Sequence, residues 1–168
     1  ADGDQSQLNQ LGRLNTSEEW WTLFASTQLS FFIDSLFDSS VEEMAVKPMV
    51  NEITIRGQGQ YAFENRLTPT AMSTMGGYYT VRGYPQSVIS GDSSVQGTIE
   101  YRYHLPRAFA SQPAGRGFLD DSFRWTRDSN TGAAPDWDLA FLGFFDAGCV
   151  WQSEPYSFED DSTTLLGA

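Results

Sequence analysis

The fold class of this chain is indicated most clearly by residues 95–105, which are Val95-Gln96-Gly97-Thr98-Ile99-Glu100-Tyr101-Arg102-Tyr103-His104-Leu105. The odd positions are apolar, aromatic or glycine, and the even positions are polar or charged. Successive side chains of a β-strand point to opposite faces, so alternation at every residue predicts a strand with one apolar and one polar face. We therefore predict a strand over residues 94–105.

The same alternation occurs in three other segments, which predict strands at residues 20–33, 53–63 and 137–151. Residues 163–168 resemble the opening of one more strand. The sequence therefore predicts an all-β, antiparallel fold. Two architectures remain open: a soluble sandwich with its apolar face inward, and an outer-membrane barrel with that face toward lipid. The segment lengths favour the barrel, because spanning strands need about 9–11 residues and ordinary strands have about 5–6.

The composition excludes several functional classes. The chain has 168 residues, 22 acidic and 10 basic, and its net charge of −12 argues against nucleic-acid binding. Its single histidine, His104, and single cysteine, Cys149, exclude a multi-histidine metal centre and an intrachain disulfide framework. No apolar run is long enough for a transmembrane helix. We expect no catalytic constellation, no metal site and no cofactor.

A long loop over residues 64–93 holds the most informative motif. It contains Gly76-Gly77, then Val81-Arg82-Gly83-Tyr84, and then Gly91-Asp92. Related motifs flank it at Gly57–Ala62, Glu100–Arg102 and Phe144–Gly148. This ordered set resembles the superfamily of outer-membrane barrel insertases and two-partner-secretion transporters. The haemolysin secretion/activation branch fits best.

The resemblance implies that the chain is a fragment of one outer-membrane barrel domain. The whole protein would have about sixteen strands and periplasmic POTRA domains, and this chain would supply part of the C-terminal half. The implied localisation is the bacterial outer membrane. The implied partners are outer-membrane lipid, the remaining barrel strands and a secreted partner polypeptide.

The resemblance also implies a site that is structural rather than catalytic. The Val81-Arg82-Gly83-Tyr84 loop would fold into the barrel lumen, where Arg82 would pair with Asp146, with Glu100 as a nearby acidic partner. The even positions of Asp146 and Glu100 place both carboxylates on the polar faces of their strands. Gly76, Gly77 and Gly91 would shape the loop. An ion pair between Glu100 and Arg102, two residues apart on one face, is the simpler interpretation for Glu100.

Residues 106–136 depart from the family pattern, because barrel turns on the periplasmic side are normally short. The resemblance predicts a transporter that secretes a partner polypeptide. An insertase of the same superfamily and a soluble aromatic-rich β-sandwich binding module remain as alternatives.

Overall fold

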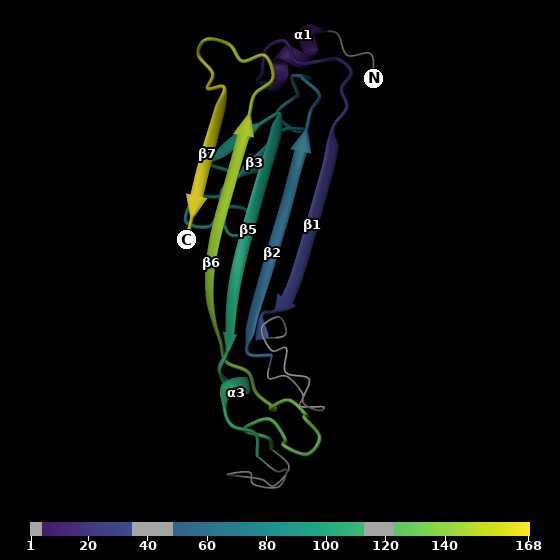
Figure 1. The fold of residues 1–168 in the computed structure, drawn as a ribbon. Helices are drawn as coiled ribbons and strands as arrows, with labels where there is room; N and C mark the ends of the chain where they lie inside the picture. The colour runs from purple at the N-terminus through teal and green to yellow at the C-terminus, as the bar shows by residue number, and fades with distance from the viewer. Residues whose placement is uncertain (1–4, 35–48, 113–122) are drawn as a thin grey trace. The chain divides into compact units, whose positions relative to one another are not determined.

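The computed structural model describes residues 5–34, 49–112 and 123–168. Five long strands form one sheet in the order β1-β2-β5-β6-β7, and successive strands run in alternate directions (Figure 1). The all-β, antiparallel prediction is therefore confirmed. In this sheet β1 and β7 are the two outer strands. The strand bounds are Leu23–Phe32 (β1), Asn51–Tyr61 (β2), Ser93–His104 (β5), Ala140–Trp151 (β6) and Ser162–Gly167 (β7).

All four predicted strands and the predicted opening of a fifth are present, with small differences at their ends. β2 ends before Phe63, because Phe63 and Glu64 adopt positive φ angles of 51° and 65° that break the strand. β6 begins at Ala140 rather than at Trp137. Trp137 instead donates its indole N–H to the carbonyl oxygen of Trp125 at 2.9 Å. β1 begins at Leu23 rather than at Trp20.

Several short elements were not predicted. The loop after β2 contains a small antiparallel sheet of β3 (Ser73–Met75) and β4 (Ile89–Gly91). Short helices lie elsewhere, among them α1 (Gln5–Leu8), the 3₁₀ helix η1 (Asn9–Leu11) and α3 (Leu105–Ala108). Within the described ranges, no helix is both long and apolar enough to cross a membrane.

Contacts divide the chain into two compact units. Unit 1 comprises residues 1–28, 55–99 and 145–168, and unit 2 comprises residues 29–54 and 100–144. The loop with the Val81–Tyr84 motif, the end of β6 and all of β7 belong to unit 1. Arg82 and Asp146 therefore lie within one unit, whereas Glu100 belongs to unit 2.

In β5 apolar side chains are exposed and polar side chains are buried, which is the reverse of the pattern in a soluble sheet. Val95, Ile99 and Tyr101 are exposed, whereas Glu100 and His104 are buried. In a sheet that faces water on one side, the apolar side chains normally pack on the core. The outer face of this strand is therefore apolar.

The predicted insertion at residues 106–136 is described except for residues 113–122, which lie outside the described ranges. Gln112 and Asp128 form an isolated bridge, and the backbone N–H of Gln112 donates to the Arg127 carbonyl oxygen at 2.9 Å. The Trp125 and Trp137 rings lie 5.8 Å apart. The segment also contacts the rest of the chain, since Arg107 Nη1 donates to the Met49 carbonyl oxygen at 3.2 Å.

Candidate functional site

One face of the β6–β7 pair forms the floor of the candidate site. Asp146 pairs with Gly167 across the two strands, and Gly148 pairs with Leu165. Residues directly opposite each other in an antiparallel pair, and residues two apart along a strand, share a face. Asp146, Gly148, Leu165 and Gly167 are all buried, so this face is covered.

Arg82 and Asp146 make the contact that the resemblance predicts. Arg82 Nε donates to Asp146 Oδ2 at 2.7 Å, and Arg82 Nη2 donates to Asp146 Oδ1 at 2.8 Å. The backbone N–H of Arg82 also donates to Oδ2, at 3.0 Å. The Asp146 side chain is 0% exposed and that of Arg82 is 15% exposed. This two-pronged geometry requires a planar guanidinium, which lysine lacks.

Val81 anchors the loop beside that ion pair. Its side chain is fully buried and belongs to a small apolar cluster with Met75, Val150 and Leu165. The cluster brings together the loop and both strands β6 and β7. Because apolar burial stabilises by about 25 cal/mol per Å² of area removed from water, this cluster supports the loop independently of charge.

Two glycines of the floor make room for the loop. A Cβ at Gly167 would lie 2.2 Å from the carbonyl oxygen of Arg82. A Cβ at Gly148 would lie 2.7 Å from Met75 Sδ and 3.0 Å from Val81 Cγ2. The loop and the strands therefore fit each other only because these two positions lack side chains.

Two of the predicted loop glycines, Gly76 and Gly77, and Gly83 of the motif lie where the chain turns, whereas Gly91 lies in a strand. Gly76, Gly77 and Gly83 have φ angles of 109°, 99° and 93°. A Cβ at Gly83 would meet nothing within 4 Å, so glycine is needed at that position for its backbone conformation rather than for space. Gly91 lies in β4 and pairs with Ser73.

Glu100 is buried, with only 4% of its surface exposed. It accepts a hydrogen bond from Arg102 Nη2 at 2.7 Å, which is the simpler of the two sequence interpretations. Its participation with Arg82 stays a prediction. Tyr84, which the sequence analysis expects to line the lumen, is among the exposed aromatic side chains of the loop, together with Tyr78 and Tyr79.

Sequence reasoning missed a second network of buried charges. Asp92 is fully buried and binds both terminal nitrogens of Arg13, with Nη2 to Oδ2 at 2.8 Å. Arg66 donates to both carboxylate oxygens of Glu159 at 2.9 and 2.7 Å. This hydrogen bonding by Arg66 lowers the pKa of Glu159 to about 2. The motif signalled Asp92, but no sequence pattern signals Arg13 or Arg66.

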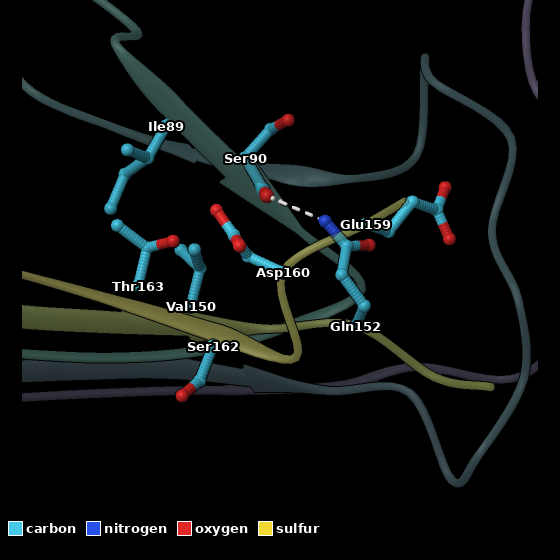
Figure 2. Close-up of a pocket in the computed structure, with 8 residues that line it drawn as sticks. All are labelled: Ile89, Ser90, Val150, Gln152, Glu159, Asp160, Ser162 and Thr163. Carbon is cyan, nitrogen blue, oxygen red and sulfur yellow. Dashed lines mark hydrogen bonds between the residues drawn. The ribbon is translucent and has the colours of Figure 1, made fainter. Parts of the chain in front are cut away.

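A small pocket of about 220 Å³ borders this second network (Figure 2). Gln152 connects the two: its Nε2 donates to the Ser90 carbonyl oxygen at 3.0 Å, and its Oε1 accepts from Arg13 Nη2 at 2.5 Å. The pocket residues are Ile89, Ser90, Val150, Gln152, Glu159, Asp160, Ser162 and Thr163.

The contacts of the site attach the loop that contains Arg82 to strands β6 and β7. Among the residues that the structure describes, no group of three or more histidine, cysteine or acidic side chains is arranged to hold a metal ion. No protein-family model, no curated protein and no solved structure matches the chain.

Proposed function

We propose that this chain is part of an outer-membrane barrel that passes a secreted partner polypeptide through its lumen. The observation that carries the proposal is the inverted alternation of β5, with exposed Val95 and Ile99 and buried Glu100. Strands of outer-membrane barrels direct apolar side chains to lipid and polar side chains to the interior. The long strands support the same proposal, since β2, β5 and β6 have 11, 12 and 12 residues.

In this proposal the loop of residues 62–92 lies on the lumen side of the barrel wall. The Arg82–Asp146 ion pair, Val81 and the glycine floor hold it there. We infer that the held loop keeps the transporter in a transport-competent state. No nucleotide-binding loop occurs in the sequence, so folding of the partner outside the cell would drive its movement.

Secretion by an Arg82→Ala variant tests this role. We expect the variant to assemble in the membrane and to lose at least 90% of secretion, because removing one partner of a buried ion pair costs about 3–5 kcal/mol and would release the loop. The matched control is Arg124→Ala, because Arg124 also donates two side-chain hydrogen bonds to a carboxylate, both to Asp136 Oδ1, but its side chain is 43% exposed. Normal secretion by an assembled Arg82→Ala protein would contradict the proposal.

The insertase alternative predicts a different consequence of the same variant. If the protein assembles other barrels, Arg82→Ala lowers the amounts of those barrels in the outer membrane, and secretion falls only as a result. Quantifying outer-membrane proteins in the variant strain separates the two roles. The soluble-module alternative predicts folding in buffer without detergent, although the exposed apolar side chains of β5 and β6 argue against it.

A further inference from the structure

Residues 10–17, here called the latch, lie against the loop of residues 62–92 through polar contacts. Within the latch, Arg13 and Thr16 are buried, whereas Leu11 and Leu14 are each 53% exposed. Leu11 and Leu14, the apolar side chains that could pack against the loop, are therefore largely exposed to solvent instead. The latch is held by charge and hydrogen bonding instead.

Asp92, at the end of the loop, is the centre of these contacts. Its carboxylate binds Arg13 through both oxygens and also accepts the backbone N–H groups of Leu67, at 2.8 Å, and Ser153, at 2.7 Å. Arg13 Nη1 donates in addition to the Leu67 carbonyl oxygen at 2.8 Å. One buried carboxylate thus joins the latch, the loop and the segment that follows β6.

Arg66, which belongs to the loop, makes further hydrogen bonds to the latch. Its carbonyl oxygen accepts from the backbone N–H of Ser17 at 2.7 Å, and its own backbone N–H donates to Ser17 Oγ at 3.1 Å. Its Nε donates to the Leu14 carbonyl oxygen at 2.8 Å. Its guanidinium binds Glu159 and lies 4.8 Å from the centre of the Tyr156 ring.

Such a network opens as a unit. When one member of a buried, hydrogen-bonded charge pair leaves, its partner remains buried and uncompensated, so partly open states are unfavourable. The Asp92 network is also distinct from the Arg82–Asp146 pair, since the two share no residue.

We propose that residues 10–17 form a releasable latch, which Arg13 closes on Asp92 and which opens independently of the Arg82–Asp146 pair. The loop is then held at two places, and it leaves the strands only when both are released. The part that the latch plays in transport rests on the proposed function. The independent opening of the latch does not depend on the proposed function.

Limited digestion of the full protein by trypsin tests this mechanism. The readout is the rate of cleavage at three bonds in the same sample, followed by mass spectrometry: Arg13–Leu14 in the latch, Arg82–Gly83 in the loop, and Arg124–Trp125 as an internal reference. The reference is suitable because the Arg124 side chain is well exposed. In the wild type we expect the first two bonds to be protected relative to the third.

Asp92→Asn is expected to accelerate cleavage at Arg13–Leu14 at least tenfold and to change cleavage at Arg82–Gly83 less than twofold. Arg13→Lys is the milder second variant, because it retains the charge and the trypsin site but loses the two-pronged contact. It should accelerate the same bond. Asp146→Asn should have the opposite effect. It should accelerate cleavage at Arg82–Gly83 and leave Arg13–Leu14 protected.

Two results would overturn the latch. One is continued protection of Arg13–Leu14 in both Asp92→Asn and Arg13→Lys. The other is proportional acceleration of both bonds in Arg13→Lys or in Asp146→Asn, which would mean that loop and latch open as one body. Neither result affects the secretion test, and normal secretion by Arg82→Ala would leave the latch in place.

Discussion

The carbonyl oxygen of Arg82 occupies the space above Gly167 that a side chain would fill, while the Arg82 guanidinium binds Asp146, the residue paired with Gly167 across β6 and β7. Arg82 therefore contacts two neighbouring strands at once. Its contact with β7 depends on the absence of a Cβ, and its contact with β6 depends on charge. Substitutions at Gly167 and at the ion pair can therefore test the two contacts separately.

Gly167→Ala should displace the loop even though it leaves the ion-pairing groups unchanged. Its Cβ would lie 2.2 Å from a backbone oxygen, which has no rotamer to change, so the Arg82 backbone itself must shift. We expect a loss of about 1–3 kcal/mol in the free energy of unfolding, as is typical of overpacking. Urea titration in lipid vesicles measures it.

Gly143→Ala is the control for that variant, because Gly143 lies in β6 and a Cβ there meets nothing within 4 Å. Its free energy of unfolding should change by less than about 0.5 kcal/mol. Equal losses in Gly167→Ala and Gly143→Ala would show that the fit between Gly167 and the Arg82 backbone has no energetic importance.

Arg82→Lys should weaken the loop attachment although it conserves charge. An ammonium group does not reproduce the two parallel hydrogen bonds to Asp146. Removing the charge of one partner, as in Arg82→Ala or Asp146→Asn, should cost about 3–5 kcal/mol because the other charge remains desolvated and uncompensated. The double variant should cost less than the sum of the two single losses, and strict additivity would mean that the two side chains do not interact.

Gly83→Ala tests backbone conformation separately from space. Gly83 has a φ of 93°, a conformation that disfavours a Cβ, and nothing lies close enough to clash with it. The expected loss is about 1–2 kcal/mol. Gly97→Ala in β5 serves for comparison, since its nearest contact would be an ordinary 3.8 Å and its φ is not positive. If Gly83→Ala and Gly97→Ala unfold at the same urea concentration, the turn does not require glycine.

Acid should weaken the contact between Arg66 and Glu159 in a defined pH range. Arg66 lowers the pKa of Glu159 from 4.5 to about 2, so the ionised carboxylate stabilises the folded protein above pH 4.5. That contribution is lost as the pH falls from about 4.5 toward about 2. The difference in unfolding free energy between the wild type and Glu159→Gln should therefore shrink over this range.

The control for this titration is the same comparison in an Arg66→Met background. Without the guanidinium that causes most of the shift, Glu159→Gln should produce a smaller difference at neutral pH, and its change below pH 4.5 should flatten. A steep loss of the difference in the Arg66→Met background would assign the pH dependence to another group.

The long strands were predictable because their information is local. Alternation over ten or more residues identifies a strand without knowledge of its neighbours, as residues 95–105 illustrate. The Arg82–Asp146 contact was predictable from the resemblance of residues 76–92 to a family motif, together with the parity of Asp146 on its strand. β3 and β4, each of three residues, are too short for a period of two to be detected.

The latch network was not predictable for a different reason. Arg13 and Asp92 are 79 residues apart, and Arg66 and Glu159 are 93 residues apart. Neither arginine stands in an alternating segment or a recognised motif, and a single arginine in a sequence carries no information about its partner. Only the folded chain, which brings three segments together at Asp92, shows the pairing.

Site-specific fluorescence in vesicles measures whether the apolar face of the strands meets lipid. In a Cys149→Ser background, the variants Thr98→Cys and Ile99→Cys would each carry an environment-sensitive fluorophore. We expect blue-shifted emission at residue 99 that lipids bearing a nitroxide on the acyl chain quench strongly, and red-shifted, weakly quenched emission at residue 98. Equal emission and equal quenching at the two positions, or stronger quenching at residue 98, would contradict it.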